Sequence, residues 1–127
     1  MTRRKRNSAP SRKAGCLEKA IDFVLSIYEA TQSLAKDEKF GLTAQLRRTA
    51  VSIPANIAEG AARKSTKEFM NFLSIAQGSP SEVETELLIA HRLRYLDDVA
   101  YLKLRRDVDD IGRMITGLSQ YLKNKES

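Results

Sequence analysis

The sequence predicts an all-α protein, an antiparallel up-down-up-down four-helix bundle, from three observations. Apolar residues recur at spacings of three and four over most of the 127 residues, as they do on one face of an α-helix. No segment alternates apolar and polar residues as a half-buried strand does. The polar breaks between the periodic segments are short, and short connections between long helices favour antiparallel neighbours.

The first 13 residues are small, polar or basic and lack periodicity, which predicts a disordered arm. A single bundle is expected over residues 14–123, followed by a short tail over 124–127. Its helices are expected at about 14–35, 40–62, 66–95 and 98–122. A chain of this length buries a continuous core without disulfides or a metal.

The first expected helix has an apolar stripe along one face. Its members are Leu17, Ala20, Ile21, Val24, Ile27, Tyr28, Thr31 and Leu34. Phe23 and Leu25 fall outside the stripe, which indicates a second buried face. Together with Val51 and Leu88, which are also apolar and off the main stripes, they are the candidates for contacts between subunits.

The second expected helix contains Pro54, which removes a backbone hydrogen bond and costs about 3 kcal/mol in an isolated helix. One kinked helix and two short helices both fit this position. The apolar stripe stays in phase on both sides of the proline, which favours one kinked helix. Its members nearest the proline are Ala50, Ile53, Ile57 and Ala61.

The third expected helix starts at a capping box, in which Ser65 and Glu68 each satisfy a backbone amide of the other. Pro80 interrupts the helix that follows. Because the apolar phase resumes after it, one long helix from Thr66 to Tyr95, bent near Pro80, is expected. The alternative is a new helix with Pro80 at its first position.

The last expected helix is capped by Asp97 or Asp98 and has a regular heptad of apolar residues. These residues are Leu104, Val108, Ile111, Ile115, Leu118 and Leu122. Gly112 and Gly117 lie within the helix and cost it about 1 kcal/mol each relative to alanine. Their presence predicts close approach of a neighbouring helix backbone.

The net charge of +6 comes from the arm and not from the bundle. Six basic residues precede Glu18, the first acid, and the remaining 16 basic residues balance the 16 acidic ones. The bundle is nevertheless polarised: residues 39–67 are mainly basic and residues 82–110 mainly acidic. This pattern fits a face for phosphates and, equally well, complementary surfaces between subunits.

The candidates for nucleic-acid binding are the paired basic residues of the second helix and its end, together with the arm, which needs no fold to contact phosphates. They are Arg3, Arg4, Lys5, Arg6, Arg47, Arg48, Arg63 and Lys64. No aromatic residue is interleaved with them to stack on bases, so sequence-specific reading of single strands is not expected.

The sequence predicts no enzyme, no cofactor and no metal. His91 is the only histidine and has no second ligand in helical register, so a solvated or hydrogen-bonded role is expected. Cys16 follows two basic residues that could lower a thiol pKa, but it has no histidine partner in sequence, and a structural role is expected. With one cysteine, no secretory signal and no membrane-spanning run, a cytoplasmic location is expected.

Residues 41–60, with the core SIPANIAEG, resemble the hallmark segment of a bacterial family, the four-helix-bundle proteins encoded in intervening sequences of 23S rRNA genes. Residues 68–87 are similar to the third helix of that family, and residues 111–118 to its last helix. The resemblance extends from about Leu17 to Leu122. Pro80 departs from the family pattern, which has a helix-favouring residue there.

The resemblance implies an up-down-up-down bundle. The family's relatives include the accessory protein of diversity-generating retroelements, a homopentameric barrel that binds a reverse transcriptase and nucleic acid. Arg47 and Arg48 match basic positions of the family segment, and no catalytic residue is transferred. The protein is therefore expected to be a non-enzymatic homo-oligomer that binds RNA or DNA, and the resemblance implies a pentamer as one form of the oligomer. The alternative is a protein-binding scaffold whose charge polarity serves self-assembly.

Overall fold

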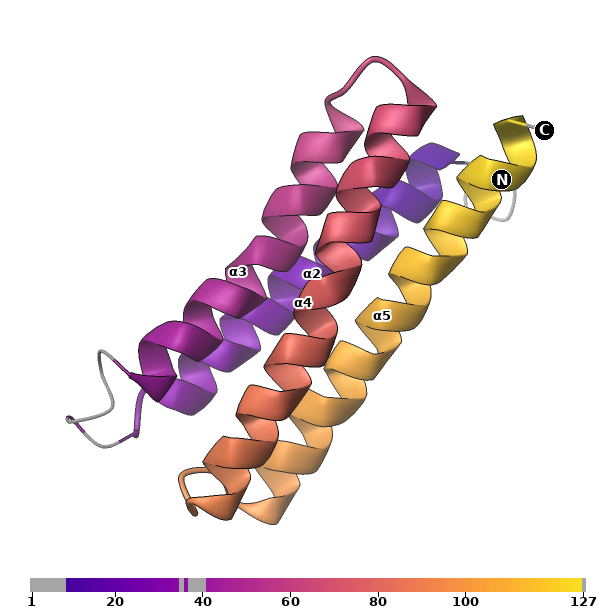
Figure 1. The fold of residues 1–127 in the computed structure, drawn as a ribbon. Helices are drawn as coiled ribbons and strands as arrows, with labels where there is room; N and C mark the ends of the chain where they lie inside the picture. Colours follow the sequence, from indigo (N-terminus) through magenta and orange to yellow (C-terminus); the bar gives the residue numbers. More distant parts are fainter. Residues whose placement is uncertain (1–8, 35, 37–40, 127) are drawn as a thin grey trace.

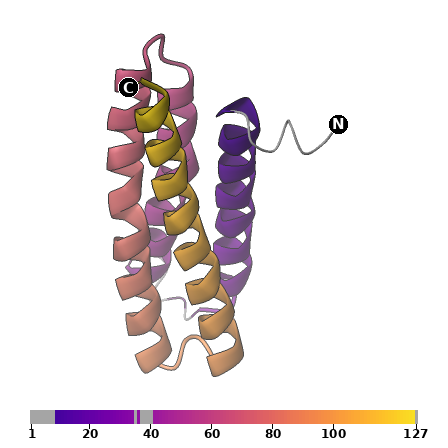
Figure 2. The ribbon, with the colours of Figure 1, turned by 90° about the vertical axis from the view of Figure 1, so that its right-hand side faces the viewer.

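The computed structural model describes residues 9–34, 36 and 41–126, and over these residues it contains four helices. They are α2 (Ala9–Thr31), α3 (Leu42–Ala61), α4 (Thr66–Arg92) and α5 (Asp98–Glu126). Successive helices run in opposite directions, and α2 also packs against α5, so each helix contacts two neighbours (Figures 1 and 2). The predicted up-down-up-down bundle is confirmed. None of the described helices is long and apolar enough to cross a membrane.

Each helix contributes one buried apolar row to a single core. Of the residues expected nearest the proline in α3, Ala50, Ile53 and Ile57 are buried as predicted, whereas Ala61 is only partly buried. The six apolar residues of the predicted α5 heptad are all at most 5% exposed. The bundle cross-section is filled mainly by large aliphatic side chains, which lose the most water-accessible area on folding. The largest fully buried ones are Phe23, Ile27, Leu46, Ile53, Ile57, Leu73, Val83, Leu87, Val108, Ile111, Ile115 and Leu118.

The predicted apolar stripe of α2 is wrong in part. Ala20, Ile27 and Thr31 of the stripe are buried as predicted, but Ile21 and Tyr28 are more than 40% exposed, and Cys16 and Phe23 are buried in their place. The more exposed row (Leu17, Ile21, Val24 and Tyr28) and the buried row (Cys16, Ala20, Phe23 and Ile27) both have helical spacing, and the buried row is the one that contains a phenylalanine. Phe23 is only 2% exposed, so its assignment to a contact between subunits is also wrong. Its ring belongs to the core of its own chain.

The helix bounds differ from the predicted ones at several ends. Residues 9–13, expected in the arm, form the first turn of α2, and α5 extends four residues further than predicted, to Glu126. α2 ends earlier, at Thr31, whose hydroxyl donates to the Ile27 carbonyl at 2.7 Å. Residues 1–8 of the predicted arm lie outside the described residues.

Both prolines lie inside continuous helices, Pro54 in α3 and Pro80 in α4. The preference for one helix at each position is therefore confirmed. Pro80 is buried against the core, so side-chain packing offsets the lost backbone bond. The expected bends at the two prolines stay predictions.

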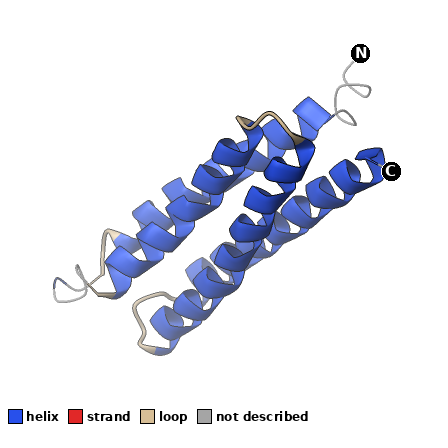
Figure 3. Cartoon of the chain, turned by 45° about the horizontal axis from the view of Figure 1, so that its top comes forward, coloured by secondary structure: helices blue, strands red, loops and turns tan. Residues whose placement is uncertain are grey.

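The loops before α4 and α5, drawn in tan in Figure 3, lead into helices that side chains cap. Ser65 Oγ accepts the Glu68 backbone amide at 3.1 Å, as the capping box predicts, and donates to the Glu68 carboxylate at 3.0 Å. The other half of the box, from the Ser65 amide to the Glu68 carboxylate, stays a prediction. At the start of α5, Asp97 accepts the Ala100 amide at 2.8 Å, which settles the choice of cap between the two aspartates. After α4, Arg94 has a φ of 66°, a left-handed conformation that favours glycine.

Candidate nucleic-acid interface

Seven basic side chains from three separate segments gather at one end of the bundle. The antiparallel packing places the start of α2, the loop between α3 and α4, and the end of α5 at this end (Figures 1 and 2). We call it the basic end, and its members are Arg12, Lys13, Arg63, Lys64, Lys67, Lys123 and Lys125. Only Arg63 and Lys64 are among the residues predicted from the sequence.

Two arginines of the basic end lie over aromatic rings. The Arg12 guanidinium lies 4.8 Å from the ring centre of Tyr121, which ties α2 to α5. The Arg63 guanidinium lies 5.0 Å from the ring centre of Phe72 and forms a 2.8 Å ion pair with Glu59. These contacts hold the two charges at the surface and cover ring faces that would otherwise be open to bases.

Most lysines of the basic end face solvent. Lys64, Lys67 and Lys125 are exposed, while Lys13 is partly buried. Of the two acids nearest to the loop, Glu59 pairs with Arg63 and Glu68 accepts the Ser65 hydroxyl. The end as a whole therefore has an excess of positive charge.

The neighbouring residues Arg47 and Arg48 have different surroundings. Arg47 Nε donates to Thr31 Oγ1 at 2.9 Å, and its Nη2 donates to the Tyr28 carbonyl at 3.3 Å. Its guanidinium also lies 4.4 Å from the Tyr28 ring centre. Arg47 thus caps the last turn of α2, where a cation also meets the negative end of the helix dipole. Arg48 is exposed and donates to Gln45 Oε1 at 3.0 Å.

The two predicted basic pairs are not brought together. Arg47 and Arg63 are separated along α3 by about 24 Å at 1.5 Å per residue. Arg3, Arg4, Lys5 and Arg6 lie outside the described residues. Because α2 begins at Ala9, this segment is covalently joined to the chain at the basic end.

The candidates for subunit contacts give a mixed result. Leu25 is 62% exposed and Val51 is 40% exposed, whereas Leu88 is partly buried against the core. Ile21 and Tyr28 are also exposed, and their spacing from Leu25 places the three on one face of α2. We call Ile21, Leu25 and Tyr28 the apolar ridge. Two of its members, Ile21 and Tyr28, were expected in the core because they share the apolar stripe of that helix.

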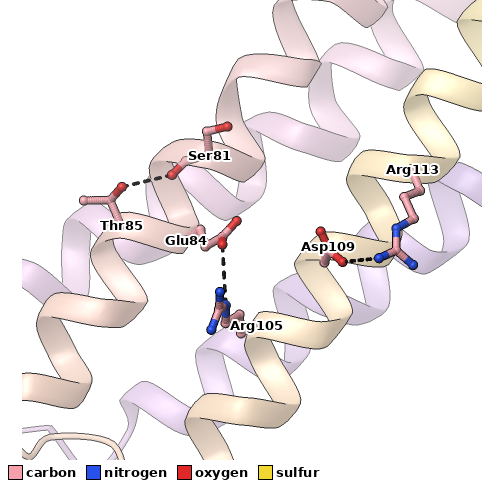
Figure 4. Close-up of polar contacts among 6 residues, drawn as sticks. All are labelled: Ser81, Glu84, Thr85, Arg105, Asp109 and Arg113. Carbon is pink, nitrogen blue, oxygen red and sulfur yellow. Dashed lines mark hydrogen bonds and ion pairs between the residues drawn. The ribbon is translucent and has the colours of Figure 1, made fainter.

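A groove of about 590 Å³ runs between α4 and α5, and its charged lining residues are two acids, Glu84 and Asp109, and one base, Arg113. Figure 4 shows Arg105 of α5 reaching Glu84 of α4, with 3.5 Å between Nε and Oε1, and Asp109 paired with Arg113 at 2.7 Å. Thr85 donates to the Ser81 carbonyl beside them. The groove therefore presents no excess of positive charge to a phosphate.

Glycines in this groove do not mark the close approach that the sequence predicts. A Cβ at Gly117 would meet nothing within 4 Å, and one at Gly112 would meet only Gln77 Nε2, at 3.9 Å. That prediction is wrong for both glycines. The close approach is at Gly60 instead, where a Cβ would lie 2.6 Å from Phe72 Cβ.

Cys16 and His91, the residues whose side chains could have a catalytic or metal-binding role, lie in surroundings that give them structural roles. Cys16 is 1% exposed, and burial raises the pKa of its thiol to about 11, so it is protonated near neutral pH. His91 Nε2 lies 2.7 Å from Asp98 Oδ1, and its ring stacks on Tyr101 with 4.3 Å between the ring centres. These contacts join the end of α4 to the start of α5.

A family model described as 23S rRNA-intervening sequence protein matches residues 12–117. No curated protein matches this chain. A similar solved structure is that of a protein of unknown function from the S23 ribosomal protein family of Bacteroides thetaiotaomicron, with a TM-score of 0.79 and 25% sequence identity. The similarity covers 86% of this chain and 98% of that one.

Proposed function

This protein belongs to the 23S rRNA-intervening sequence protein family, and we propose that it is a non-enzymatic bundle that binds RNA or DNA through its basic end. The observation that supports the proposal is the convergence of basic side chains from three segments on one end. Arg3, Arg4, Lys5 and Arg6, which precede α2 in the sequence, add four positive charges. We place this activity in the cytoplasm, in keeping with the single buried cysteine.

The surroundings of the basic end favour contact with phosphates over contact with bases. Lysine is a flexible point charge that meets backbone phosphates without fixed geometry. The aromatic rings nearest to it, Tyr121 and Phe72, lie beneath guanidinium groups. Binding should therefore tolerate many sequences and weaken steeply with salt, because each phosphate contact releases counterions.

Residue chemistry also supports a non-enzymatic role. A nucleophilic cysteine must be a thiolate, and the burial of Cys16 keeps its thiol protonated. The imidazole of His91 is engaged by Asp98 and Tyr101. A general base needs a nucleophile within hydrogen-bonding reach, and neither contact supplies one.

Fluorescence anisotropy with labelled duplex RNA and single-stranded DNA tests the proposal. The variant Lys64→Gln, Lys67→Gln, Lys125→Gln removes three exposed charges of the basic end. The matched control Arg48→Gln, Arg92→Gln, Arg106→Gln removes three exposed charges elsewhere. If each lysine contacts a phosphate, the first variant should bind on the order of 100-fold more weakly at 0.1 M salt, and the control should bind nearly as well as the wild type. Equal loss in both variants, or no binding by the wild type, would reject the proposal.

The apolar ridge favours a second candidate function, a self-assembling scaffold for a protein partner. Leu25 is the most exposed residue of the ridge, and Val51 of α3 lies one turn beyond Arg47, which contacts Tyr28 of the ridge. A row of exposed apolar side chains is typical of an interaction surface. A homo-oligomer would cover the ridge, and the pentamer of the retroelement accessory proteins is one possible assembly.

Light scattering after size exclusion tests the self-assembly. The wild type should exceed the 14.3 kDa of one chain at micromolar concentration, and Leu25→Glu should reduce it to a monomer. Leu102→Glu is the matched control, because Leu102 is 53% exposed on α5, away from the ridge. A monomeric wild type would reject the scaffold, and so would an assembly that both variants leave intact.

A further inference from the structure

The interface between α3 and α4 contains a buried carboxyl group whose partners are incomplete. Glu86 is 7% exposed, although glutamate is rarely buried without a partner. Its Oε2 lies 3.3 Å from Thr49 Oγ1, and its Oε1 has neither solvent contact nor a hydrogen-bond partner. Glu82, one turn earlier, places its own Oε2 at 3.0 Å from the same Thr49 hydroxyl.

The hydrogens around Thr49 are too few for two ionised glutamates. The hydroxyl has one hydrogen but lies near three acceptors: the Gln45 carbonyl at 2.8 Å, Glu82 Oε2 and Glu86 Oε2. Gln45 Nε2 donates to Glu82 Oε2 at 3.2 Å, so Glu82 has a donor of its own. An ionised Glu86 would compete with Glu82 for the single hydroxyl hydrogen, with its second oxygen buried and unpaired. Such a charge is costly to bury.

We propose that Glu86 retains its proton in the folded protein and forms a hydrogen-bond relay across the α3–α4 interface, which loosens when the proton is lost. Glu86 Oε2–H donates to Thr49 Oγ1, and the Thr49 hydroxyl donates to Glu82 Oε2. Gln45 Nε2 donates to the same Glu82 oxygen. Each hydrogen is used once, and the single remaining charge is on Glu82, the more exposed carboxylate.

The charges around Glu86 leave it without a direct cationic partner. On α4, Glu82 lies one turn away and reaches the same Thr49 hydroxyl. On α3, Arg48 adjoins Thr49 in the sequence, and its guanidinium is bound to Gln45 Oε1. The charges that α5 directs at α4 are Arg105, paired with Glu84, and Asp98, paired with His91. Both pairs are on the side of α4 that contacts α5, and Glu86 is on the side that contacts α3.

The electrostatics agree with the hydrogen count. Burial is the largest cause that raises the pKa of Glu86, and the negative charge of Glu82 raises it further. The amide of Gln45 and the hydroxyl of Thr49 are close enough to lower that pKa as donors, but the Gln45 hydrogen bond is made to Glu82 Oε2 and not to Glu86. A carboxyl whose pKa is higher in the folded state contributes stability below the unfolded pKa, about 4.3 for glutamate. That stability is lost as the pH rises through the folded value.

Two measurements on the full chain test the relay. The ¹³C shift of the Glu86 carboxyl, followed with pH, should report the protonated form above the unfolded value of about 4.3. Urea denaturation should show that the wild type loses stability as the pH rises above that unfolded value. Glu86→Gln, whose amide donates to Thr49 like the protonated acid, should remove that loss and be more stable than the wild type at pH 7.5.

Glu84→Gln is the matched control, because Glu84 lies on the same helix but contacts α5 through Arg105. This variant should keep the pH-dependent loss of stability. A Glu86 carboxyl that ionises at or below the unfolded value of about 4.3, or the same pH dependence in Glu86→Gln and wild type, would overturn the proposal. So would a change of the Glu86 signal on adding Mg²⁺ or Ca²⁺ at constant pH, because a cation would then take the place of the proton. If Glu86→Gln does not fold, the carboxyl titration of the wild type decides alone.

Discussion

Replacing Gly60 with alanine should destabilise the bundle, although alanine is the better helix former. The glycine lies near the end of α3, where α4 crosses it closely. The new Cβ would lie 2.6 Å from Phe72 Cβ, 3.0 Å from Phe69 Cδ1 and 3.2 Å from the Phe69 carbonyl oxygen. Neither the Cβ of Phe72 nor the backbone of Phe69 can rotate away, so the start of α4 must move from α3.

The magnitude follows from two opposed terms. Forcing an extra methyl into a packed interface costs about 1–3 kcal/mol, and more where backbone must move. The gain in helix propensity from glycine to alanine is up to about 1 kcal/mol, and less near a helix end. The net loss for Gly60→Ala should therefore be about 1–2 kcal/mol, or roughly 3–8 °C in Tm for a chain of this size.

Urea denaturation followed by circular dichroism measures this loss. Gly117→Ala and Gly78→Ala are the matched controls, because a Cβ at either position meets nothing within 4 Å. Both controls should gain up to about 1 kcal/mol. If Gly60→Ala is stabilised as much as the two controls, the close packing of α3 on α4 at this point is incorrect.

Four further predictions rest on the contacts of Arg47 and Ser65, the burial of Cys16 and the backbone of Arg94. Arg47→Ala should lower the unfolding free energy by about 1–2 kcal/mol, because it removes the hydrogen bonds to the end of α2, whereas Arg48→Ala should change it by less than about 0.5 kcal/mol. Cys16 should resist a thiol reagent at pH 8 until urea unfolds the chain, because burial raises its pKa to about 11. Arg94→Gly should raise the unfolding free energy by about 0.5–1 kcal/mol, because glycine relieves the left-handed φ of 66°. Ser65→Ala should lower it by about 1 kcal/mol through loss of the α4 cap.

Each of these changes has a result that contradicts its reasoning. Equal losses in the two arginine variants would mean that Arg47 has no special role at the end of α2. Rapid labelling of Cys16 in the folded protein would contradict its burial. An Arg94→Gly variant less stable than the wild type would contradict the left-handed backbone, and an unchanged Ser65→Ala would show that the cap is dispensable.

The helices of the fold were predictable because the heptad of α5 has one apolar face and because Ser65 and the Asp97-Asp98 pair mark where α4 and α5 begin. The apolar row of α2 was not. Leu17, Ile21, Val24 and Tyr28 form a helical row as regular as the buried row one position before it. Hydrophobic spacing alone does not select between two adjacent rows, because the choice depends on which row fits the opposing helices.

The basic end was only partly predictable for a different reason. Lysines and arginines at residues 12–13, 63–67 and 123–125 are far apart in the chain and become neighbours only when the helices alternate in direction. That signal was available from the predicted topology, which places these three segments at one end. Arg47 and Arg48, by contrast, are adjacent in the sequence but separated in their contacts. Adjacent residues on a helix point about 100° apart, so the two arginines bind different partners.

The salt dependence of nucleic-acid binding tests the role of the basic end most directly. For duplex RNA, the logarithm of the association constant should fall linearly with the logarithm of salt concentration. The variant Lys64→Gln, Lys67→Gln, Lys125→Gln should have a slope shallower by about 2–3, since each lost phosphate contact removes about 0.9. The control variant of Arg48, Arg92 and Arg106 should retain the wild-type slope. A slope that the lysine substitutions leave unchanged would contradict binding through the basic end.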